Sequence, residues 1–315
     1  DVYKRQVILK AAPDTPWTAT MLGRIVKQHT DIPAGVFNVI TAEDPATLGD
    51  QLVADPRVDM VSFTGSTTVG KHIMARASET VKKVFLELGG KSANIILDDA
   101  DLSSSLLSAL AVCFHAGQGC ALNTRLLIPR QKQAEVEGLL KTYFDFISYG
   151  DPEAEGAIMG PQVNARQRER VLSYIEKGRE EGARVLLGGG VPQHLDKGYY
   201  VEPTVFVDVT NDMAIAREEI FGPVLAVIAY DDEEDAIRIA NDSDYGLSGS
   251  VWSASEDRAI AVARRIRTGT INVNGGNFYG ADAPFGGYKQ SGLGREMGPE
   301  GFEEYLETKT IAIGA

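Results

Sequence analysis

Short apolar runs alternate with amphipathic stretches along the first part of the chain. The apolar runs predict strands near residues 7–9, 36–40, 60–63 and 83–88. Between them, apolar positions recur with the helical period, which predicts helices over residues 15–28, 46–53 and 66–77. Strands of this kind, separated by helices, are typical of a parallel sheet that is covered on both faces.

The same pattern begins again after Gly90. We expect strands at residues 93–97, 125–128, 224–228, 249–252 and 270–273, with helices at 102–114, 234–241 and 256–266. The alternating segment 305–313 predicts an extended strand that has no partner nearby in the sequence. The fold class expected is therefore α/β, with two successive units.

Composition and net charge limit the kinds of molecule that the protein is expected to bind. The 315 residues are 43% hydrophobic and 24% charged, as in ordinary globular proteins, and the net charge is −13. Such a charge argues against nucleic acid and anionic membranes as partners, and no apolar run is long enough to cross a bilayer. The acidic run 231–235 suits the start of a helix. The four histidines lack metal-ligand spacing, so we expect no metal site.

A glycine turn at residues 65–72, GSTTVGKH, follows a predicted strand and opens a predicted helix. It departs from a P-loop at its last position, where His72 replaces the magnesium-binding Ser or Thr. Gly65 would let a phosphate approach the backbone, and Ser66 would cap a helix whose free N–H groups attract an anion. An ordinary capped helix explains the segment equally well.

The chain has two cysteines, Cys113 and Cys120. Cys113 lies among apolar residues of a predicted helix and is interpreted as a packed thiol. Cys120 follows the turn formed by Gly117 and Gly119, which would expose its sulfur and help to lower its pKa. An unreactive buried cysteine remains the alternative. We expect free thiols and a cytoplasmic location, because a reducing compartment suits this cysteine usage.

Glu87 stands at the end of an apolar strand, where the pattern changes from one unit to the next. Ligands of α/β proteins bind beyond the carboxyl ends of strands. Burial there would raise the pKa of this carboxyl and suit it to general-base catalysis. The alternative is a glutamate that forms a salt bridge, with Lys91 as its partner.

Five segments in sequence order resemble motifs of the NAD(P)-dependent aldehyde dehydrogenase superfamily. They are LELGGKS at residues 86–92, GQGC at 117–120, EEIFGP at 218–223, residues 241–246, and PFGGYK at 284–289. The resemblance covers the chain from about Val7 onward.

The resemblance implies roles for particular residues. Cys120 would be the nucleophile and Glu87 the base that activates water. The cofactor would be bound by Lys10 at the adenosine ribose, Gly65 and Ser66 at the pyrophosphate, and Glu219 and Phe221 at the nicotinamide riboside. Asn274 and Phe285 would line the substrate pocket. The implied reaction oxidises an aldehyde to a carboxylic acid through a thiohemiacetal and a thioester on Cys120.

The family's architecture is also implied. The fold would comprise the remainder of a Rossmann-like parallel-sheet cofactor domain, an α/β catalytic domain and a C-terminal oligomerisation strand. We expect residues 1–89 to form the C-terminal half of the dinucleotide-binding domain and residues 90–288 the catalytic domain. Residues 289–315 would be a return segment with the oligomerisation strand, and the full-length protein a homodimer or homotetramer.

Two departures from the family pattern affect these expectations. Pro13 stands where NAD-preferring members carry an acidic residue, with Asp14 one position later, so NADP is an alternative to the favoured NAD. The family's N-terminal part, which carries an oxyanion-hole asparagine, is absent from this sequence. Losing one such donor costs about 10²–10³ in rate, so we expect this chain by itself to be inactive or unstable.

Two other classes of function are alternatives to an aldehyde dehydrogenase. A non-catalytic binding or structural protein on the same fold would need neither Cys120 nor Glu87. A thiol hydrolase would use Cys120 but would not need Lys10, Ser66 or Glu219, and the adjacent His115 is no evidence for a Cys–His pair, whose members are normally distant in sequence.

Overall fold

The computed structural model describes residues 5–277 and 279–314, which form two compact units. The first unit contains residues 1–61 and 71–84, and the second contains residues 62–70 and 85–315. The chain passes from one unit to the other within β3 (Met60–Thr64), α3 (Thr67–Ala77) and β4 (Lys83–Glu87). The compact units thus change at residue 85, slightly before the domain boundary expected after residue 89.

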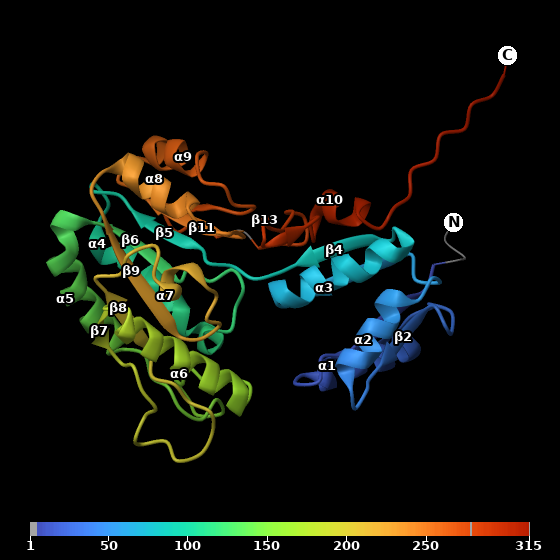
Figure 1. Cartoon of the computed structure of the whole chain (residues 1–315), viewed down its shortest axis with the longest axis horizontal. Helices are drawn as coiled ribbons and strands as arrows, with labels where there is room; N and C mark the ends of the chain where they lie inside the picture. The colour runs from blue at the N-terminus through green and yellow to red at the C-terminus, as the bar shows by residue number, and fades with distance from the viewer. Residues whose placement is uncertain (1–4, 278, 315) are drawn as a thin grey trace. The chain divides into compact units, whose positions relative to one another are not determined.

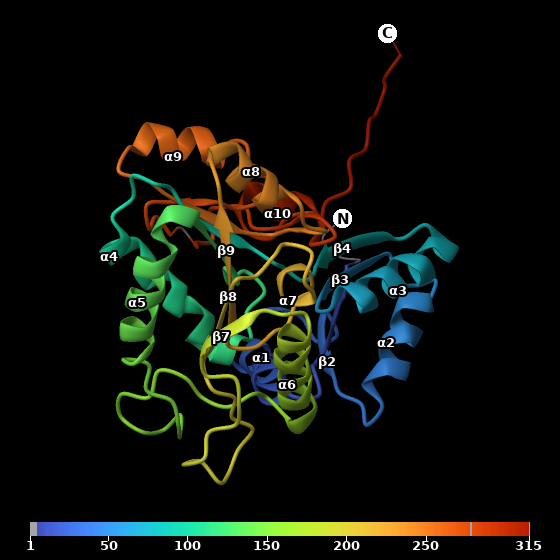
Figure 2. The ribbon, with the colours of Figure 1, turned by 60° about the vertical axis from the view of Figure 1, so that its left-hand side comes forward.

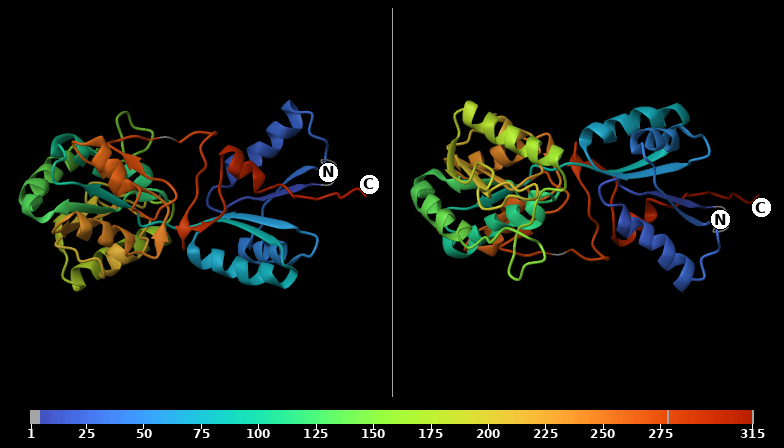
Figure 3. Two further views of the ribbon diagram at one scale, coloured as in Figure 1. Left: turned by 90° about the horizontal axis from the view of Figure 1, so that it is seen from above. Right: turned by 90° about the horizontal axis from the view of Figure 1, so that it is seen from below.

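The first unit is built around two parallel strands, β1 (Val7–Lys10) and β2 (Phe37–Ile40). Helices α1 (Pro16–His29) and α2 (Pro45–Ala54) lie on opposite sides of this pair (Figure 3). Asp44 caps α2 by accepting hydrogen bonds from the N–H groups of Ala46 and Thr47. The short 3₁₀ helix η1 (Ser78–Thr80) follows α3.

A small sheet carries Glu87 at the end of one strand. Its order is β14-β4-β3, and β14 (Gly292–Leu293) runs antiparallel to β4 with Gly292 opposite Glu87. A late part of the chain therefore returns to the strand that bears the predicted base.

The second unit contains a seven-stranded sheet of order β12-β11-β5-β6-β9-β8-β7 (Figure 1). All neighbours are parallel except β7 and β8, which are antiparallel. The strands are β5 (Ala93–Ile96), β6 (Arg125–Pro129), β7 (Arg184–Leu187), β8 (Thr204–Val207), β9 (Val224–Tyr230), β11 (Gly249–Trp252) and β12 (Asn272–Val273). A separate pair joins β10 (Tyr245–Gly246) to β13 (Tyr288–Lys289).

Helices cover both faces of this sheet. Successive residues of β6 point to opposite faces, so that Leu127 packs in one core and Leu126 and Ile128 in the other. Figure 2 shows α5 on one side of β7–β9 and α6 on the other. One layer contains α6 (Ala165–Glu180), α7 (Ala214–Arg217), α8 (Glu233–Asn241) and α9 (Glu256–Ala263). The other contains α4 (Leu102–Ser105), the 3₁₀ helices η2 (Leu106–Gly117) and η3 (Arg130–Lys132), and α5 (Gln133–Phe144).

The predicted α/β class is confirmed, and so are strands and helices in nearly all the expected places. The single helix expected over residues 102–114 is instead α4 followed by the 3₁₀ segment η2, which turns out of helical geometry at Phe114. None of the described helices is long and apolar enough to span a membrane.

The end of the chain differs from the prediction. A short helix, α10 (Gly298–Glu303), ends before the segment that was expected to be a strand. Residues 306–314 form no strand within the described chain, and Ile311 and Ile313 are 76% and 90% exposed. The physical reason is that a strand needs a hydrogen-bonded neighbour, and this chain supplies none there.

Arg125 opens β6 and is 2% exposed, which makes it the basis of a stability prediction. Its guanidinium donates to the carbonyls of Lys91, Ile239 and Ala240 and to Asn211 Oδ1, at 2.8–3.0 Å. We expect Arg125→Met to lower the free energy of unfolding by more than about 2 kcal/mol, because it leaves these buried acceptors unpaired.

Urea denaturation of the wild type and of Arg125→Met measures the difference in their free energies of unfolding. Arg130→Met is the matched control, since Arg130 is exposed and pairs with Asp231 at the surface, where an ion pair contributes about 0–1 kcal/mol. Equal losses in the two variants would show that the buried hydrogen bonds of Arg125 do not stabilise the unit.

Candidate active site

Cys120 lies in a turn that the backbone shapes tightly. His115, Ala116 and Gly117 all have positive φ angles, of 52°, 54° and 74°. A Cβ on Gly117 would come within 2.0 Å of the Gly222 carbonyl carbon, so only glycine fits there. Cys120 is half-buried, Cys113 is fully buried, and both are free thiols. The structure therefore confirms the distinction predicted between the packed and the accessible cysteine.

Gly90 holds the same turn from another side. A Cβ added to Gly90 would lie 2.3 Å from the carbonyl oxygen of Cys120, far inside contact distance. The backbone of Cys120 thus packs directly against the Gly89-Gly90 segment that follows Glu87.

This contact predicts a loss of function for Gly90→Ala. The new methyl group must displace the Cys120 backbone, and a shift of about 1 Å can cost about 10²-fold in turnover. The turnover of the reaction in which Cys120 takes part measures the loss. Gly138→Ala, in α5, is the control, because a Cβ there meets nothing within 4 Å. Wild-type turnover in Gly90→Ala would contradict the role of this contact.

The electrostatics of Cys120 differ from the expectation. Burial raises the pKa of its thiol, and the carboxylates of Glu219 and Glu87 raise it further, while the backbone N–H groups of Cys120 and Ala121 act in the opposite direction. The predicted lowering of the pKa was wrong, because the sequence showed neither the burial of the thiol nor the approach of the two carboxylates.

Glu87 is 2% exposed, and neither of its carboxyl oxygens has a hydrogen-bond partner among the described residues. The salt-bridge alternative for this residue is therefore wrong. Gly286 leaves room for the carboxyl, since a Cβ there would lie 2.9 Å from Glu87 Oε1. A buried carboxyl without a partner is costly to fold, which favours a role in catalysis over one in stability.

Burial raises the pKa of Glu87 to about 8, and nearby Glu296 contributes to the rise, whereas Arg295 opposes it. Glu296 is a residue that the sequence analysis missed. It approaches Glu87 because its backbone pairs with that of Phe285, with N–H to carbonyl distances of 2.6 and 2.7 Å. No periodicity or local motif around Glu296 would have indicated this proximity.

Glu219 lies against the same glycine pair. The N–H of Gly90 donates to Glu219 Oε1 at 2.9 Å, and a Cβ on Gly89 would lie 2.6 Å from Oε2. Burial raises the pKa of the Glu219 carboxyl, while this N–H and the ammonium group of Lys91 lower it. Cys120, Glu87 and Glu219 are thus brought together around residues 87–90.

Two side chains of α6 hold the segment that bears Glu219 and Phe221. Arg170 donates to the Glu219 carbonyl at 2.8 Å, and Gln167 donates to the Phe221 carbonyl at 2.7 Å. Phe221 has a φ of 61° and is 37% exposed. The sequence analysis missed Gln167 and Arg170, because a polar helix face gives no sign of which backbone it will meet.

The remaining predicted cofactor residues lie as follows. Ser66 Oγ accepts from the N–H of Val69 at 3.3 Å, which confirms Ser66 as the cap of α3. Gly65 is needed for packing, since a Cβ there would lie 2.4 Å from the Phe63 ring. Lys10 belongs to the first unit, where its ammonium donates to the Ala11 carbonyl at 3.1 Å.

The two predicted substrate residues differ in their surroundings. Asn274 is exposed, and its Oδ1 accepts from the N–H of Ser253 at 2.9 Å. Its φ of 49° is one that asparagine tolerates. Phe285 is half-buried and contacts Tyr279 edge to face, with 5.8 Å between ring centroids.

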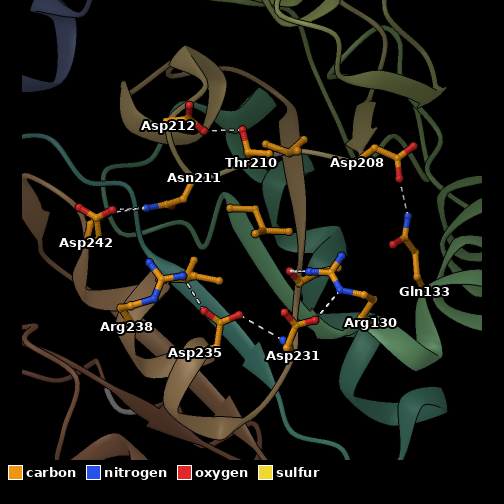
Figure 4. Close-up of a pocket in the computed structure, with 14 residues that line it drawn as sticks. Arg130, Gln133, Asp208, Thr210, Asn211, Asp212, Asp231, Asp235, Arg238 and Asp242 are labelled. Atoms are coloured by element: carbon orange, nitrogen blue, oxygen red, sulfur yellow. Dashed lines mark hydrogen bonds and ion pairs between the residues drawn. The ribbon is translucent and has the colours of Figure 1, made fainter.

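A cavity of about 580 Å³ lies elsewhere in the second unit (Figure 4). None of Cys120, Glu87 and Glu219 lines it. Its carboxylates are occupied by neighbours, as in the contacts of Asp235 with Arg238 and of Asp242 with Asn211. In the part of the chain that the structure describes, no three His, Cys, Asp or Glu side chains gather as they would around a metal ion.

Comparison with known proteins gives the family. The sequence profile of the aldehyde dehydrogenase family matches residues 5–311. The chain belongs to the aldehyde dehydrogenase family. The expected resemblance is thereby confirmed, and with it the expected fold class.

Individual relatives agree with this assignment. A 3-succinoylsemialdehyde-pyridine dehydrogenase of Pseudomonas is 47% identical over 97% of this chain and 64% of the relative. The crystal structure of an aldehyde dehydrogenase of Mycobacterium tuberculosis with NAD⁺ matches with a TM-score of 0.91 and 46% identity, over 95% of this chain and 61% of that one. A second crystal structure is that of a cysteine-to-alanine variant of aldehyde dehydrogenase C from Pseudomonas syringae, with NAD⁺ and octanal. It matches with a TM-score of 0.93 and 43% identity, over 96% of this chain and 62% of that one. This chain spans about 64% of the length of the curated relatives that it matches.

Proposed function

We propose that this chain provides the catalytic groups of an NAD(P)-dependent aldehyde dehydrogenase, which oxidises an aldehyde to a carboxylic acid. The observation that carries the proposal is the proximity of three groups: the half-buried thiol of Cys120, the unpaired buried carboxyl of Glu87 and the carboxylate of Glu219. A thiol hydrolase would have no use for Glu219, and a purely structural protein would have no use for the unpaired Glu87.

The residues of the chain perform the following steps. Cys120 Sγ gives up its proton and adds to the aldehyde carbon, which forms a thiohemiacetal. Backbone N–H groups of the Cys120 turn stabilise the oxyanion. A nicotinamide held beside Glu219 and Phe221 would supply the hydride acceptor that the oxidation of the thiohemiacetal to a thioester on Cys120 requires. Glu87 then takes a proton from water, whose oxygen attacks the thioester carbon; the carbon–sulfur bond breaks, the acid leaves, and the Cys120 thiolate regains a proton from Glu87.

The predicted cofactor residues fit a dinucleotide. Glu219 Oε1 accepts a backbone N–H, while Oε2 has no hydrogen-bond partner among the described residues and can accept from a ribose hydroxyl. Ser66 and the first turn of α3 offer N–H groups to a pyrophosphate. Lys10 is assigned to the adenosine ribose and Phe221 to the nicotinamide ring. NAD is favoured because the relatives above were solved with NAD⁺, although Pro13 leaves no carboxylate to repel the extra phosphate of NADP.

Three wider proposals accompany the reaction. Asn274 and Phe285 would border the substrate. The exposed apolar side chains of residues 305–313 would pair with a second subunit in a homodimer or homotetramer. The two free thiols suit a cytoplasmic location.

The pH dependence of thioester hydrolysis follows from Glu87. A general base must be ionised, and the pKa of Glu87 is about 8, so the rate should rise with pH and level off above about pH 8. Glu296→Gln removes a negative neighbour that raises this pKa, so its profile should move to lower pH. Single-turnover hydrolysis measured from pH 6 to pH 10 gives both curves. Glu234→Gln, at the surface, is the control, and an unchanged profile in Glu296→Gln would contradict the coupling.

Reduced-cofactor formation tests the proposal directly. The 315-residue chain, and the chain extended to the length of its relatives, are mixed with NAD⁺ or NADP⁺ and with octanal as the probe aldehyde. Aldehyde-dependent absorbance at 340 nm in at least one of the two proteins, with octanoic acid as product, is the expected result. Hydrolysis of thioesters without any cofactor reduction in either protein would instead establish a thiol hydrolase.

A further inference from the structure

A row of buried and half-buried polar side chains adjoins the segment that follows Cys120. Asn94 of β5 and Ser250 of β11 are register partners on adjacent parallel strands, so their side chains emerge on the same face of the sheet. Asn94 is 1% exposed and Ser250 is 7% exposed. Ser108 of η2 and Asn123, three residues after Cys120, complete the row.

The row contains two hydrogen bonds of the same type and length. Asn123 Nδ2 donates to Ser250 Oγ at 2.7 Å, and Asn94 Nδ2 donates to Ser108 Oγ at 2.7 Å. The first bond attaches the segment after the nucleophile to the sheet, whereas the second attaches the start of η2. They therefore form a natural pair for comparison, because only one of them reaches the Cys120 turn.

Asn123 is the anchor of that turn. Among residues 5–277 and 279–314, its side chain makes the one hydrogen bond that joins residues 119–123 to another element. The nearest alternative, from the Leu122 N–H to the Gly119 carbonyl at 3.4 Å, is long and stays within the turn. On the other side, Gly90 packs directly against the Cys120 carbonyl. The nucleophile is thus fixed between one close backbone contact and one side-chain bond.

In the described chain, only one end of the Asn123 amide is hydrogen-bonded. Asn123 Oδ1 is buried without a partner among the described residues. An apolar side chain at this position would avoid that desolvation penalty, which is about 1–3 kcal/mol for a buried acceptor. Asn94 Oδ1, in the second bond of the row, is likewise buried without a partner among the described residues, so the two asparagines differ only in the segment that each Nδ2 group holds.

We propose that Asn123, through Ser250, is a positioning residue that holds the Cys120 sulfur beside Glu87 and Glu219. The inference rests on the proposed function of Cys120 as nucleophile. Without the bond, the turn would be free to move away from the two carboxylates. The sulfur would then be more accessible to solvent and farther from the groups that complete the reaction.

The test compares Asn123→Ala and Ser250→Ala with Ser108→Ala, which breaks the twin bond. Alkylation of Cys120 by iodoacetamide is followed by peptide mass spectrometry across pH, with buried Cys113 as the internal reference for unfolding. Both anchor variants should alkylate Cys120 about three- to tenfold faster at pH 7.5, because the released thiol ionises at lower pH when it leaves the carboxylates. Turnover in the extended protein should fall about 10²-fold, with little change in KM for the aldehyde.

The controls separate positioning from stability. Ser108→Ala also removes the hydrogen bond from Ser108 Oγ to the Ser105 carbonyl, so it should lower the melting temperature at least as much as Ser250→Ala does, yet keep the wild-type alkylation profile of Cys120. Ser250→Thr, which retains the hydroxyl, should restore both alkylation and turnover, and it tests the inference even if Asn123→Ala does not fold. Wild-type alkylation and turnover in Ser250→Ala would overturn the inference alone. If wild-type Cys120 reacts no faster than Cys113, the proposed function fails first, and this inference with it.

Discussion

Cys120→Ser is expected to lower aldehyde oxidation by at least about 10⁴-fold, because it removes the group that carries both covalent intermediates. A serine hydroxyl is much less acidic than the thiol that it replaces, so it stays protonated beside the two carboxyls and is a weak nucleophile. Binding of the cofactor should be unaffected, since the predicted cofactor residues remain unchanged. Initial rates with saturating aldehyde and cofactor measure the effect, and a fluorescence titration of cofactor binding is the companion measurement.

Cys113→Ala is the matched control for this variant. Cys113 is fully buried in the core beneath the sheet, so its loss should lower stability slightly and leave turnover at the wild-type level. If Cys113→Ala and Cys120→Ser lost activity equally, the account of Cys120 as the nucleophile would be wrong.

Glu87→Gln is expected to have the second-largest effect, and on a different step. Steady-state turnover should fall about 10²–10⁴-fold, because the water that attacks the thioester loses its base. The first turnover should persist, so that one equivalent of reduced cofactor appears rapidly and is followed by a slow phase. Rapid mixing at 340 nm separates the two phases.

The stability of this variant is also informative. Glutamine keeps the shape of the side chain and removes its capacity to ionise in a buried site, so Glu87→Gln should be at least as stable as the wild type. Loss of the rapid phase together with the slow one would indicate that Glu87 acts before the thioester forms, which would contradict the assigned role.

Much of the fold could be predicted from the sequence because its strands are short, apolar and separated by helices of clear period. The runs of apolar residues predicted the positions of β4, β5 and β6, and the glycines near Cys120 indicated a tight turn. Three features could not be predicted. The 3₁₀ geometry of η2 depends on packing beneath the sheet, the alternating pattern of residues 305–313 did not reveal that the segment forms no strand within the described chain, and the polar helix α6 showed no distinctive pattern.

The site was predictable in its principal residues and not in their surroundings. Cys120, Glu87 and Ser66 occupy positions that local sequence marks, at a turn, a strand end and a helix start. Glu296 reaches Glu87 only through a pairing between distant segments. Burial and contacts of this kind determine pKa values, which explains why the direction of the shift at Cys120 was predicted wrongly.

The covalent intermediate can be observed directly. The extended Glu87→Gln protein is mixed with NAD⁺ and octanal, quenched in acid within the rapid phase, digested and analysed by mass spectrometry. An octanoyl group on the peptide that contains Cys120, absent when NAD⁺ is left out, is the predicted result. An unmodified Cys120 peptide at a time when reduced cofactor has already formed, or an acyl group on Cys113 instead, would contradict the assignment of Cys120 as the nucleophile.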